Sequence, residues 1–349
     1  MSRRGRAIVV ERPGETSIGE IETMACGDDD VLIKSLVAGV CRTDLKIAEG
    51  RMPPHTISYP CIPGHEWAGT VESTGRNVTD LKPGDRVVCE GMVYCGHCEN
   101  CLNGRTNLCR NYDQLGFTRP GGYGEFVVAP RRVVHALPDH VSVAAGVLVE
   151  PASCVGYGFE RLSPQAGETI GVVGVGTLGS LAILIARTFS PSAVIAYGIT
   201  DEDVSQALEL GADHAVNLAK EDAEAATVKA LGEGPDVVLE AAGASEAVAT
   251  SLGLARRGGR VVLMGSAGDG QTMNLPTDVF MRKDLTVHGS LSYTSGAWAR
   301  TMSLLDSGLE VDRLITHRFP LERFDEAFQL MESRSERVVK ILLEHESPQ

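Results

Sequence analysis

Apolar and polar positions follow different periods in the two halves of the chain. Up to about residue 155 the apolar residues fall in short runs broken by glycine and proline, which is typical of β-strands joined by tight turns. Few stretches of this half have a helical period, so the pattern predicts a partly open, barrel-like β domain. The expected strands are 7–10, 30–37, 67–73, 86–90 and 124–128.

In the second half, short apolar runs alternate with segments whose apolar residues recur every three or four positions. This alternation predicts an α/β fold with a doubly wound parallel sheet. The elements after about residue 291 are expected to rejoin the β domain, which gives one domain of residues 1–155 and 291–349 and an inserted domain of residues 156–290. The expected strands are 170–174, 193–197, 215–217, 236–240, 260–264, 285–288 and 338–343, and the expected helices are 201–210, 222–231, 245–254, 298–306 and 325–333.

A glycine-rich turn joins the first strand of the second half to the helix that follows. Gly174, Gly176 and Gly179 have the spacing Gly-x-Gly-x-x-Gly, and Thr177 and Leu178 lie between the last two. The first glycine permits a tight turn, the second lets the backbone approach a pyrophosphate, and the third lets the helix pack on the strand. The N–H groups of the helix then face the phosphates. The sequence therefore predicts a dinucleotide site at this turn.

Residues 170–186 carry no charge and approach the length of a membrane span. Four glycines in the first ten positions make this a poor isolated helix, and the strand–helix units downstream favour a buried strand and turn instead. The formal net charge of −14 repels nucleic-acid phosphates and anionic lipids, so we expect neither partner. The apolar run after the N-terminal arginines is too short for a signal peptide, which favours a cytoplasmic protein.

Four of the nine cysteines are gathered in one segment. Cys95, Cys98, Cys101 and Cys109 have the spacing C-x2-C-x2-C-x7-C. Four thiolates satisfy the tetrahedral preference of zinc and leave no position for a substrate. Such density is more typical of metal ligation in a reducing compartment than of a disulfide framework. The cysteine spacing therefore predicts a structural zinc lobe at residues 95–109. The alternative is that the four cysteines are free thiols.

A second set of metal-ligand residue types is spread along the β half. Cys41 lies in Gly-x-Cys-Arg-Thr-Asp, His65 and Glu66 lie in Pro-Gly-His-Glu, and Glu150 precedes a proline. Each alone has a structural explanation: core packing for the cysteine, a satisfied imidazole for the histidine and a turn for the Glu-Pro pair. Together they offer one thiolate, one imidazole and two carboxylates, the mixed set of a catalytic zinc that keeps a position open for substrate or water.

These motifs, in this order and at these separations, resemble the zinc-containing medium-chain alcohol dehydrogenase family over essentially the whole chain. The resemblance implies a GroES-like catalytic domain, a Rossmann domain, and interconversion of a secondary alcohol and its ketone by hydride transfer with NAD or NADP. It also implies one catalytic and one structural zinc, with Cys41 and His65 as ligands of the first and Glu66 as a ligand or exchangeable neighbour. Thr43 would relay the alcohol proton, and Asp44 would orient a ligand.

Glu150 stands where the liver-type members of the family place a third zinc cysteine. A Glu-Pro pair there is similar to the sorbitol, threonine and glucose dehydrogenase branch, which favours a polyol, sugar or aminocyclitol substrate, with L-threonine or glucose as the alternative. Lys46 replaces the histidine that often ends the proton relay, and it is either a relay or substrate-binding group or a solvated lysine. A non-catalytic, NADPH-binding zinc protein is a further alternative, against which the intact ligand set argues.

Gly198 ends the second strand, where NAD-dependent members carry an acid for the ribose 2′-hydroxyl. Without that acid, the chain lacks a hydrogen-bond acceptor for the ribose of NAD. It also lacks a negative charge that would repel the 2′-phosphate of NADP. Both coenzymes therefore stay open, with a lean to NADP, although no arginine or lysine follows at once to hold that phosphate. Thr200 with Asp203 is interpreted first as a helix N-cap, whose hydroxyl and N–H groups are also available to a phosphate.

Alignment with the family assigns the remaining coenzyme residues. Lys340 would bind the pyrophosphate, and Gly265, Ser266 and Ser290 would flank the nicotinamide. The resemblance also implies a homodimer or homotetramer, in which the strands at 260–264 and 285–290 extend the sheet across a two-fold axis.

Overall fold

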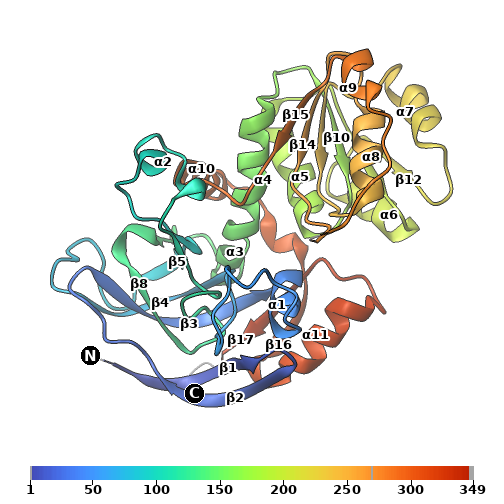
Figure 1. The fold of residues 1–349 in the computed structure, drawn as a ribbon. Helices are drawn as coiled ribbons and strands as arrows, with labels where there is room; N and C mark the ends of the chain where they lie inside the picture. Colours follow the sequence, from blue (N-terminus) through green and yellow to red (C-terminus); the bar gives the residue numbers. More distant parts are fainter. Residues whose placement is uncertain (1, 269, 346–349) are drawn as a thin grey trace. The chain divides into compact units, whose positions relative to one another are not determined.

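The computed structural model describes residues 2–268 and 270–345. These residues form two compact units, drawn in Figure 1: the first comprises the described residues up to Glu150 together with those from Met302 onward, and the second is Pro151–Thr301. The expected domain boundaries at residues 155 and 291 stay a prediction. None of the described helices has the length and apolar character that crossing a bilayer requires.

In the first unit, β3 (Asp30–Val40) pairs in antiparallel register with β4 (Trp67–Thr74), β8 (Phe126–Pro130) and β17 (Lys340–Glu344). Strands from both ends of the chain therefore meet in one sheet. The sheet is completed by β5 (Arg86–Cys89), β9 (Val134–Ala136) and β16 (Ile315–Pro320), and the smaller pairs are β1 (Arg4–Arg12) with β2 (Glu15–Glu22) and β6 (Met92–Val93) with β7 (Asp113–Gln114). The helices are α1 (Arg42–Ala48), α2 (Glu99–Leu102), α3 (Val143–Val147) and α11 (Phe324–Ser333).

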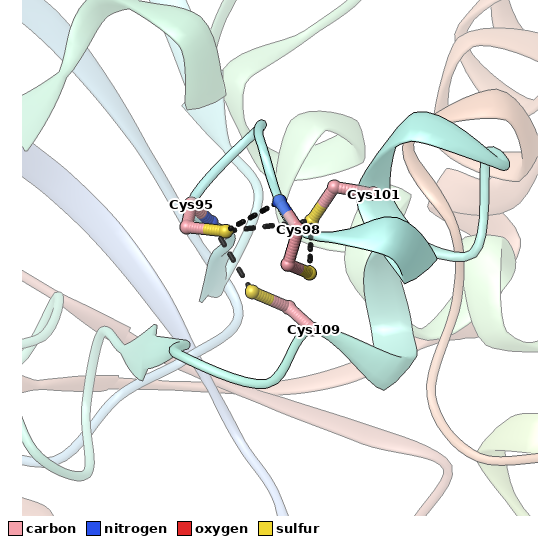
Figure 2. Close-up of side chains that lie close together, drawn as sticks. All are labelled: Cys95, Cys98, Cys101 and Cys109. Atoms are coloured by element: carbon pink, nitrogen blue, oxygen red, sulfur yellow. Dashed lines mark hydrogen bonds between the residues drawn. The ribbon is translucent and has the colours of Figure 1, made fainter.

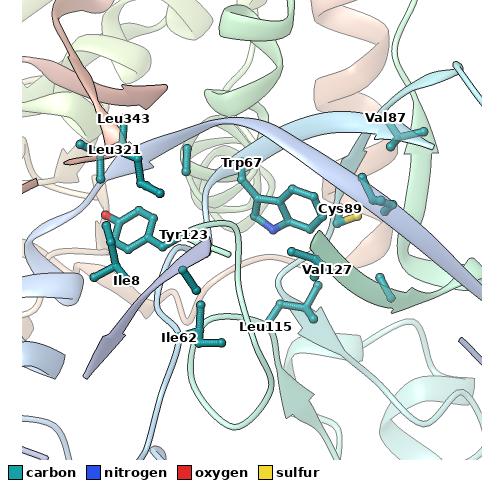
Figure 3. Close-up of a cluster of buried hydrophobic side chains, with 14 of the residues drawn as sticks. Ile8, Ile62, Trp67, Val87, Cys89, Leu115, Tyr123, Val127, Leu321 and Leu343 are labelled. Carbon is teal, nitrogen blue, oxygen red and sulfur yellow. The ribbon is translucent and has the colours of Figure 1, made fainter. Parts of the chain in front are cut away.

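Buried apolar side chains from these strands and their loops form the core of the first unit (Figure 3). Trp67 at the start of β4 and Tyr123 in the loop before β8 are its largest members and are both buried. Ile8 from β1 and Leu343 from β17 belong to the same cluster, so residues more than three hundred positions apart share one core. The adjoining ends of β3 and β4 therefore rest on a closely packed base.

The second unit is a parallel sheet flanked by helices. Its strands are β10 (Thr169–Val173), β11 (Ala193–Gly198), β12 (His214–Asn217), β13 (Val237–Glu240), β14 (Arg260–Leu263) and β15 (Thr286–Gly289). Its helices are α5 (Thr177–Ala186), α6 (Asp201–Glu209), α7 (Ala223–Leu231), α8 (Ser245–Leu254) and α9 (Asp278–Lys283). Over the described residues the strand order is β12-β11-β10-β13-β14-β15, with every pair parallel. This is the 3-2-1-4-5-6 order of a dinucleotide-binding sheet, so the predicted doubly wound sheet is confirmed.

The remaining helices complete the chain. Two of them, α4 (Val149–Leu162) and α10 (Ser295–Asp306), run across the two points where the chain passes between the units. Short 3₁₀ helices cover Thr106–Leu108, Arg131–Val133, Arg187–Phe189, Val311–Leu314 and Leu321–Arg323.

Candidate active site

Three of the predicted zinc ligands come together where β3 ends and β4 begins. Cys41 follows β3 directly and is the N-cap residue of α1, and His65 and Glu66 immediately precede β4. Because Ala38 of β3 pairs with Trp67 of β4, the antiparallel register brings these strand ends together. The sulfur, a ring nitrogen and a carboxylate oxygen of the three residues lie within 4.8 Å of one another. This donor set fits a zinc ion that keeps a position open.

The fully buried carboxylate of Asp44 connects the parts of this cluster. Its Oδ2 accepts hydrogen bonds from the backbone N–H of Cys41 at 2.9 Å and from the hydroxyl of Tyr123 at 3.0 Å. Its Oδ1 accepts one from the N–H of Gly64 at 3.3 Å and lies 3.3 Å from Nδ1 of His65, without hydrogen-bond alignment. Burial is the largest single influence on the pKa of His65 and lowers it, but Asp44 and Cys41 together outweigh burial and hold that pKa well above its usual value. Asp44 therefore joins the backbone segments that carry Cys41 and His65. The role expected for it in orienting a zinc ligand stays a prediction.

The variant Asp44→Asn is expected to lower kcat/KM by about 10- to 100-fold, the range found for carboxylates that orient metal ligands. The amide keeps the shape of the side chain but loses its charge. Its NH₂ group would also face a hydrogen-bond donor that a carboxylate oxygen of Asp44 now accepts. Steady-state kinetics and zinc content per chain check this expectation. Asp85→Asn, at an exposed turn that also accepts a backbone N–H, is the matched control. Unchanged kinetics in Asp44→Asn would show that Asp44 is not needed to orient the ligands.

A buried ion pair lies beside the ligand cluster. Lys340 of β17 is 1% exposed, and its Nζ donates to Oε2 of Glu66 and, at 3.3 Å, to the carbonyl of Val40. Burial alone lowers the pKa of Lys340, but Glu66 and Cys41 outweigh it and raise that pKa. Within the first unit the ammonium of Lys340 supplies the counter-charge of Glu66. The contact of Lys340 with a coenzyme pyrophosphate stays a prediction.

The other predicted catalytic residues lie on α4 and α1. Glu150 is in the first turn of α4, where burial raises its pKa to about 7 while His65 acts in the opposite direction. Within the described residues the tight ligand group holds Cys41, His65 and Glu66 but not Glu150. Thr43 and Lys46 are half-buried on α1. The roles expected for these three residues stay predictions.

Figure 2 shows the side chains of Cys95, Cys98, Cys101 and Cys109 pointing toward one another. Their sulfur atoms all lie within 4.8 Å, with 3.5 Å between Cys98 and Cys101. Backbone N–H groups, that of Arg110 first, lower the pKa of Cys98 to about 6, which favours a thiolate. All nine cysteines lie in the described ranges and are free of disulfides. The arrangement fits a tetrahedral, closed zinc site.

The glycine turn between β10 and α5 is closed toward the sheet and open on its outer side. Gly174 has a φ of +94°, and a Cβ on Gly179 would lie 1.8 Å from the carbonyl oxygen of Gly174. A Cβ on Gly176 would meet nothing within 4 Å. No side-chain oxygen caps α5, whose first turn contains Thr177 and Leu178, so its N-terminal dipole is available to an anion. The geometry of the turn fits a pyrophosphate, and the binding of a dinucleotide by these residues stays a prediction.

Loops after β13, β14 and β15 meet at the carboxyl edge of the sheet. The carboxylate of Glu240, fully buried at the end of β13, accepts three backbone N–H groups, including those of Gly243 at 2.7 Å and Gly265 at 3.0 Å. The backbone of Ser266 packs closely on Gly243. A Cβ built on Gly243 would lie 2.9 Å from the backbone nitrogen of Ser266. The buried Oγ of Ser290 has no hydrogen-bond partner among the described residues. An unsatisfied hydroxyl at this edge suits the carboxamide of a nicotinamide.

Gly198 and Thr200 lie between β11 and α6. The Oγ1 of Thr200 accepts the N–H of Asp203 at 3.0 Å, and the carboxylate of Asp203 accepts the N–H of Thr200 at 3.1 Å. This reciprocal pair is a capping box, so the interpretation of Thr200 as a helix N-cap is confirmed.

Two protein-family models match the chain: an alcohol dehydrogenase GroES-like domain over residues 27–139 and a zinc-binding dehydrogenase over residues 177–307. An L-threonine 3-dehydrogenase of Anaeromyxobacter sp. (strain K) is 35% identical over 321 residues, which are 90% of this chain and 91% of that protein. Among solved structures, a zinc-binding dehydrogenase of Sinorhizobium meliloti 1021 bound to NADP matches with a TM-score of 0.90 and 31% identity, covering 98% of this chain and 99% of that one. Galactitol-1-phosphate dehydrogenase of Escherichia coli matches with a TM-score of 0.88 and 28% identity, covering 97% and 99%. The chain therefore belongs to the zinc-containing medium-chain alcohol dehydrogenase family and is a zinc-dependent, NAD(P)-linked oxidoreductase.

Proposed function

We propose that this enzyme interconverts a secondary alcohol and its ketone, and that the substrate is a polyol, sugar or aminocyclitol. The observation that carries the proposal is the cluster of Cys41, His65 and Glu66, whose ligand atoms lie within 4.8 Å of one another. The buried partners Asp44 and Lys340 hold this cluster in place. A non-catalytic binding protein has no need for such a supported ligand set.

Each residue of the cluster has a task in the proposed reaction. Cys41 and His65, with a carboxylate from Glu66 or Glu150, would hold the catalytic zinc, which supplies Lewis acidity toward the hydroxyl oxygen of the substrate. Thr43 is the second residue of α1, two positions after the first ligand, and would pass the hydroxyl proton toward solvent. The glycine turn would bind the coenzyme pyrophosphate.

Oxidation of L-threonine at its C3 hydroxyl is the second candidate, and the match to an L-threonine 3-dehydrogenase over 90% of this chain favours it. Threonine, like a polyol or aminocyclitol, carries a polar group on the carbon next to the reacting alcohol. It differs in its carboxylate, which requires a cation in the site. Because Lys340 is paired with Glu66, Lys46 on α1 is the lysine of this region that we assign to that task.

Initial rates of NADH and NADPH formation, measured with polyols, aldoses, aminocyclitols, L-threonine and ethanol, test the proposal. We expect the highest kcat/KM with a polyol, sugar or aminocyclitol and the lowest with ethanol. Turnover confined to L-threonine would select the second candidate, and Lys46→Met would then raise the KM for threonine but not that for a neutral diol. Protein that holds two zinc ions per chain and turns over none of these compounds would contradict both.

A further inference from the structure

The side chain of Asp203 covers the end of β11. A Cβ built on Gly198 would lie 2.3 Å from the Cβ of Asp203 and 3.1 Å from its Oδ2. Separations below about 3 Å do not occur between real side chains, so Gly198 is glycine because a residue of the next helix already fills its place. The carboxylate of Asp203 therefore lies beside the position from which an acid at residue 198 would extend.

The same carboxylate is anchored on the backbone that follows the strand. Its Oδ2 accepts the N–H groups of Ile199 at 2.9 Å and Thr200 at 3.1 Å, and no other hydrogen bond or ion pair of this carboxylate is found among the described residues. The strand end also adjoins the glycine turn, because the N–H of Gly174 donates to the carbonyl of Tyr197 at 2.8 Å. One carboxylate oxygen is thus fixed, and the other remains available beside the predicted pyrophosphate site.

We propose that Asp203 replaces the acid missing from position 198 and makes the enzyme selective for NAD over NADP. The inference rests on the proposed coenzyme site at the glycine turn. An adenosine ribose bound there would donate its 2′-hydroxyl to the second oxygen of Asp203. This reverses the lean to NADP that the lone glycine suggested, and the NADP-bound relative shows only that the family admits that coenzyme.

A 2′-phosphate is disfavoured at this strand end for two reasons. The N–H groups of Ile199 and Thr200, which a phosphate would need, already donate to Asp203. Asp201 and Glu202 add carboxylates in the same helical turn, and Lys220 is paired with Asp201 at 2.5 Å. An added phosphate would therefore face carboxylates without a basic side chain held ready for it.

Calorimetric titration of the zinc-loaded enzyme with NADH and with NADPH tests the proposal without turnover. Wild-type protein should bind NADH at least about tenfold more tightly than NADPH. A hydrogen bond to a charged group is strong enough to produce a difference of this size. Asp203→Asn keeps an oxygen that caps the helix but loses the charge, so the Kd for NADH should rise about tenfold and the preference over NADPH should shrink.

Moving the aspartate from position 203 to position 198 distinguishes recognition of the coenzyme ribose from a structural effect on the helix. Asp203→Gly should weaken NADH binding, and the double variant Gly198→Asp/Asp203→Gly, which returns the acid to the strand end, should recover it. Asp222→Asn changes a capping aspartate of another helix, the N-cap residue of α7 that accepts the N–H of Ala225, and should change neither affinity.

The outcomes distinguish this inference from the proposed function. Equal or tighter binding of NADPH by the wild-type enzyme overturns the role of Asp203 while leaving the coenzyme site intact. Unaltered affinities in Asp203→Asn, or no recovery in the exchange variant, reduce Asp203 to a helix cap. Binding of neither coenzyme by the wild-type protein refutes the proposed function itself, and the selectivity falls with it.

Discussion

Replacing Cys41 by serine is expected to lower kcat/KM by at least about a thousandfold, because metal-ion polarisation of the reacting oxygen contributes several kcal/mol to the transition state. A serine hydroxyl is a poor zinc ligand at neutral pH, so the ligand cluster of Cys41, His65 and Glu66 loses its thiolate. Zinc content should fall from two ions per chain to one. The Kd for NADH should stay within about twofold, since the glycine turn lies in the other unit of the chain.

The matched control is Cys26→Ser. Cys26 is a half-buried cysteine whose sulfur donates to the backbone carbonyls of Gly27 and Asp30, and it belongs to neither ligand cluster. It should keep two zinc ions and normal turnover. Wild-type turnover in Cys41→Ser with only one zinc ion bound would remove the catalytic zinc from the proposed mechanism.

Local sequence signals account for the accuracy of the prediction in the second unit. Each strand there is a short apolar run beside a turn or a helical period, and the expected strands 193–197 and 260–264 differ from β11 and β14 by one residue at one end. By contrast, β2 and β16 are absent from the predicted strands. Neither has a fully buried residue, so their sequences lack the apolar alternation of a core strand, and they are held by pairing with β1 and β17.

The ligand residues of the site were predictable because each has a motif, whereas their partners were not. Lys340 lies 274 positions from Glu66, and Tyr123 lies 79 positions from Asp44, so only the tertiary fold reveals these pairs. For Tyr123, the available signal was its place among three glycines in residues 121–124, where a large side chain is unusual. For Glu240, missed in the same way, the signal was a single carboxylate closing an apolar strand.

Sequence reasoning also missed the position of Asp203, here because a known rule points to a different residue. The strand-end rule applies to position 198 and finds a glycine there. It does not reveal that a residue five positions later folds back over that glycine, because helix capping and coenzyme recognition require the same residue type. Only the separation between the two positions in space distinguishes these interpretations.

Replacing Cys98 by serine is expected to have the opposite phenotype to the loss of Cys41: a large loss of stability with turnover largely retained. Of residues 95–109, all within the described chain, only Thr106, Asn107 and Cys109 are buried, and Leu102 is 74% exposed. A segment with so little apolar burial has no core of its own, so the metal supplies the free energy that holds its fold.

Structural zinc sites contribute apparent binding free energies of about 10–16 kcal/mol in isolated zinc-finger peptides. Even if the lobe transmits only about 4 kcal/mol of this to the unfolding of the first unit, Tm should fall by about 8–16 °C. Zinc content should drop from two ions per chain to one, and kcat at 25 °C should change by less than about threefold, because the four lobe cysteines are separate from the Cys41 cluster. Differential scanning calorimetry, metal analysis and steady-state rates measure the three quantities. Leu102→Ser, an exposed change in the same lobe, should alter none of them. A Cys98→Ser protein with two zinc ions and an unchanged Tm would show that the lobe folds without its metal.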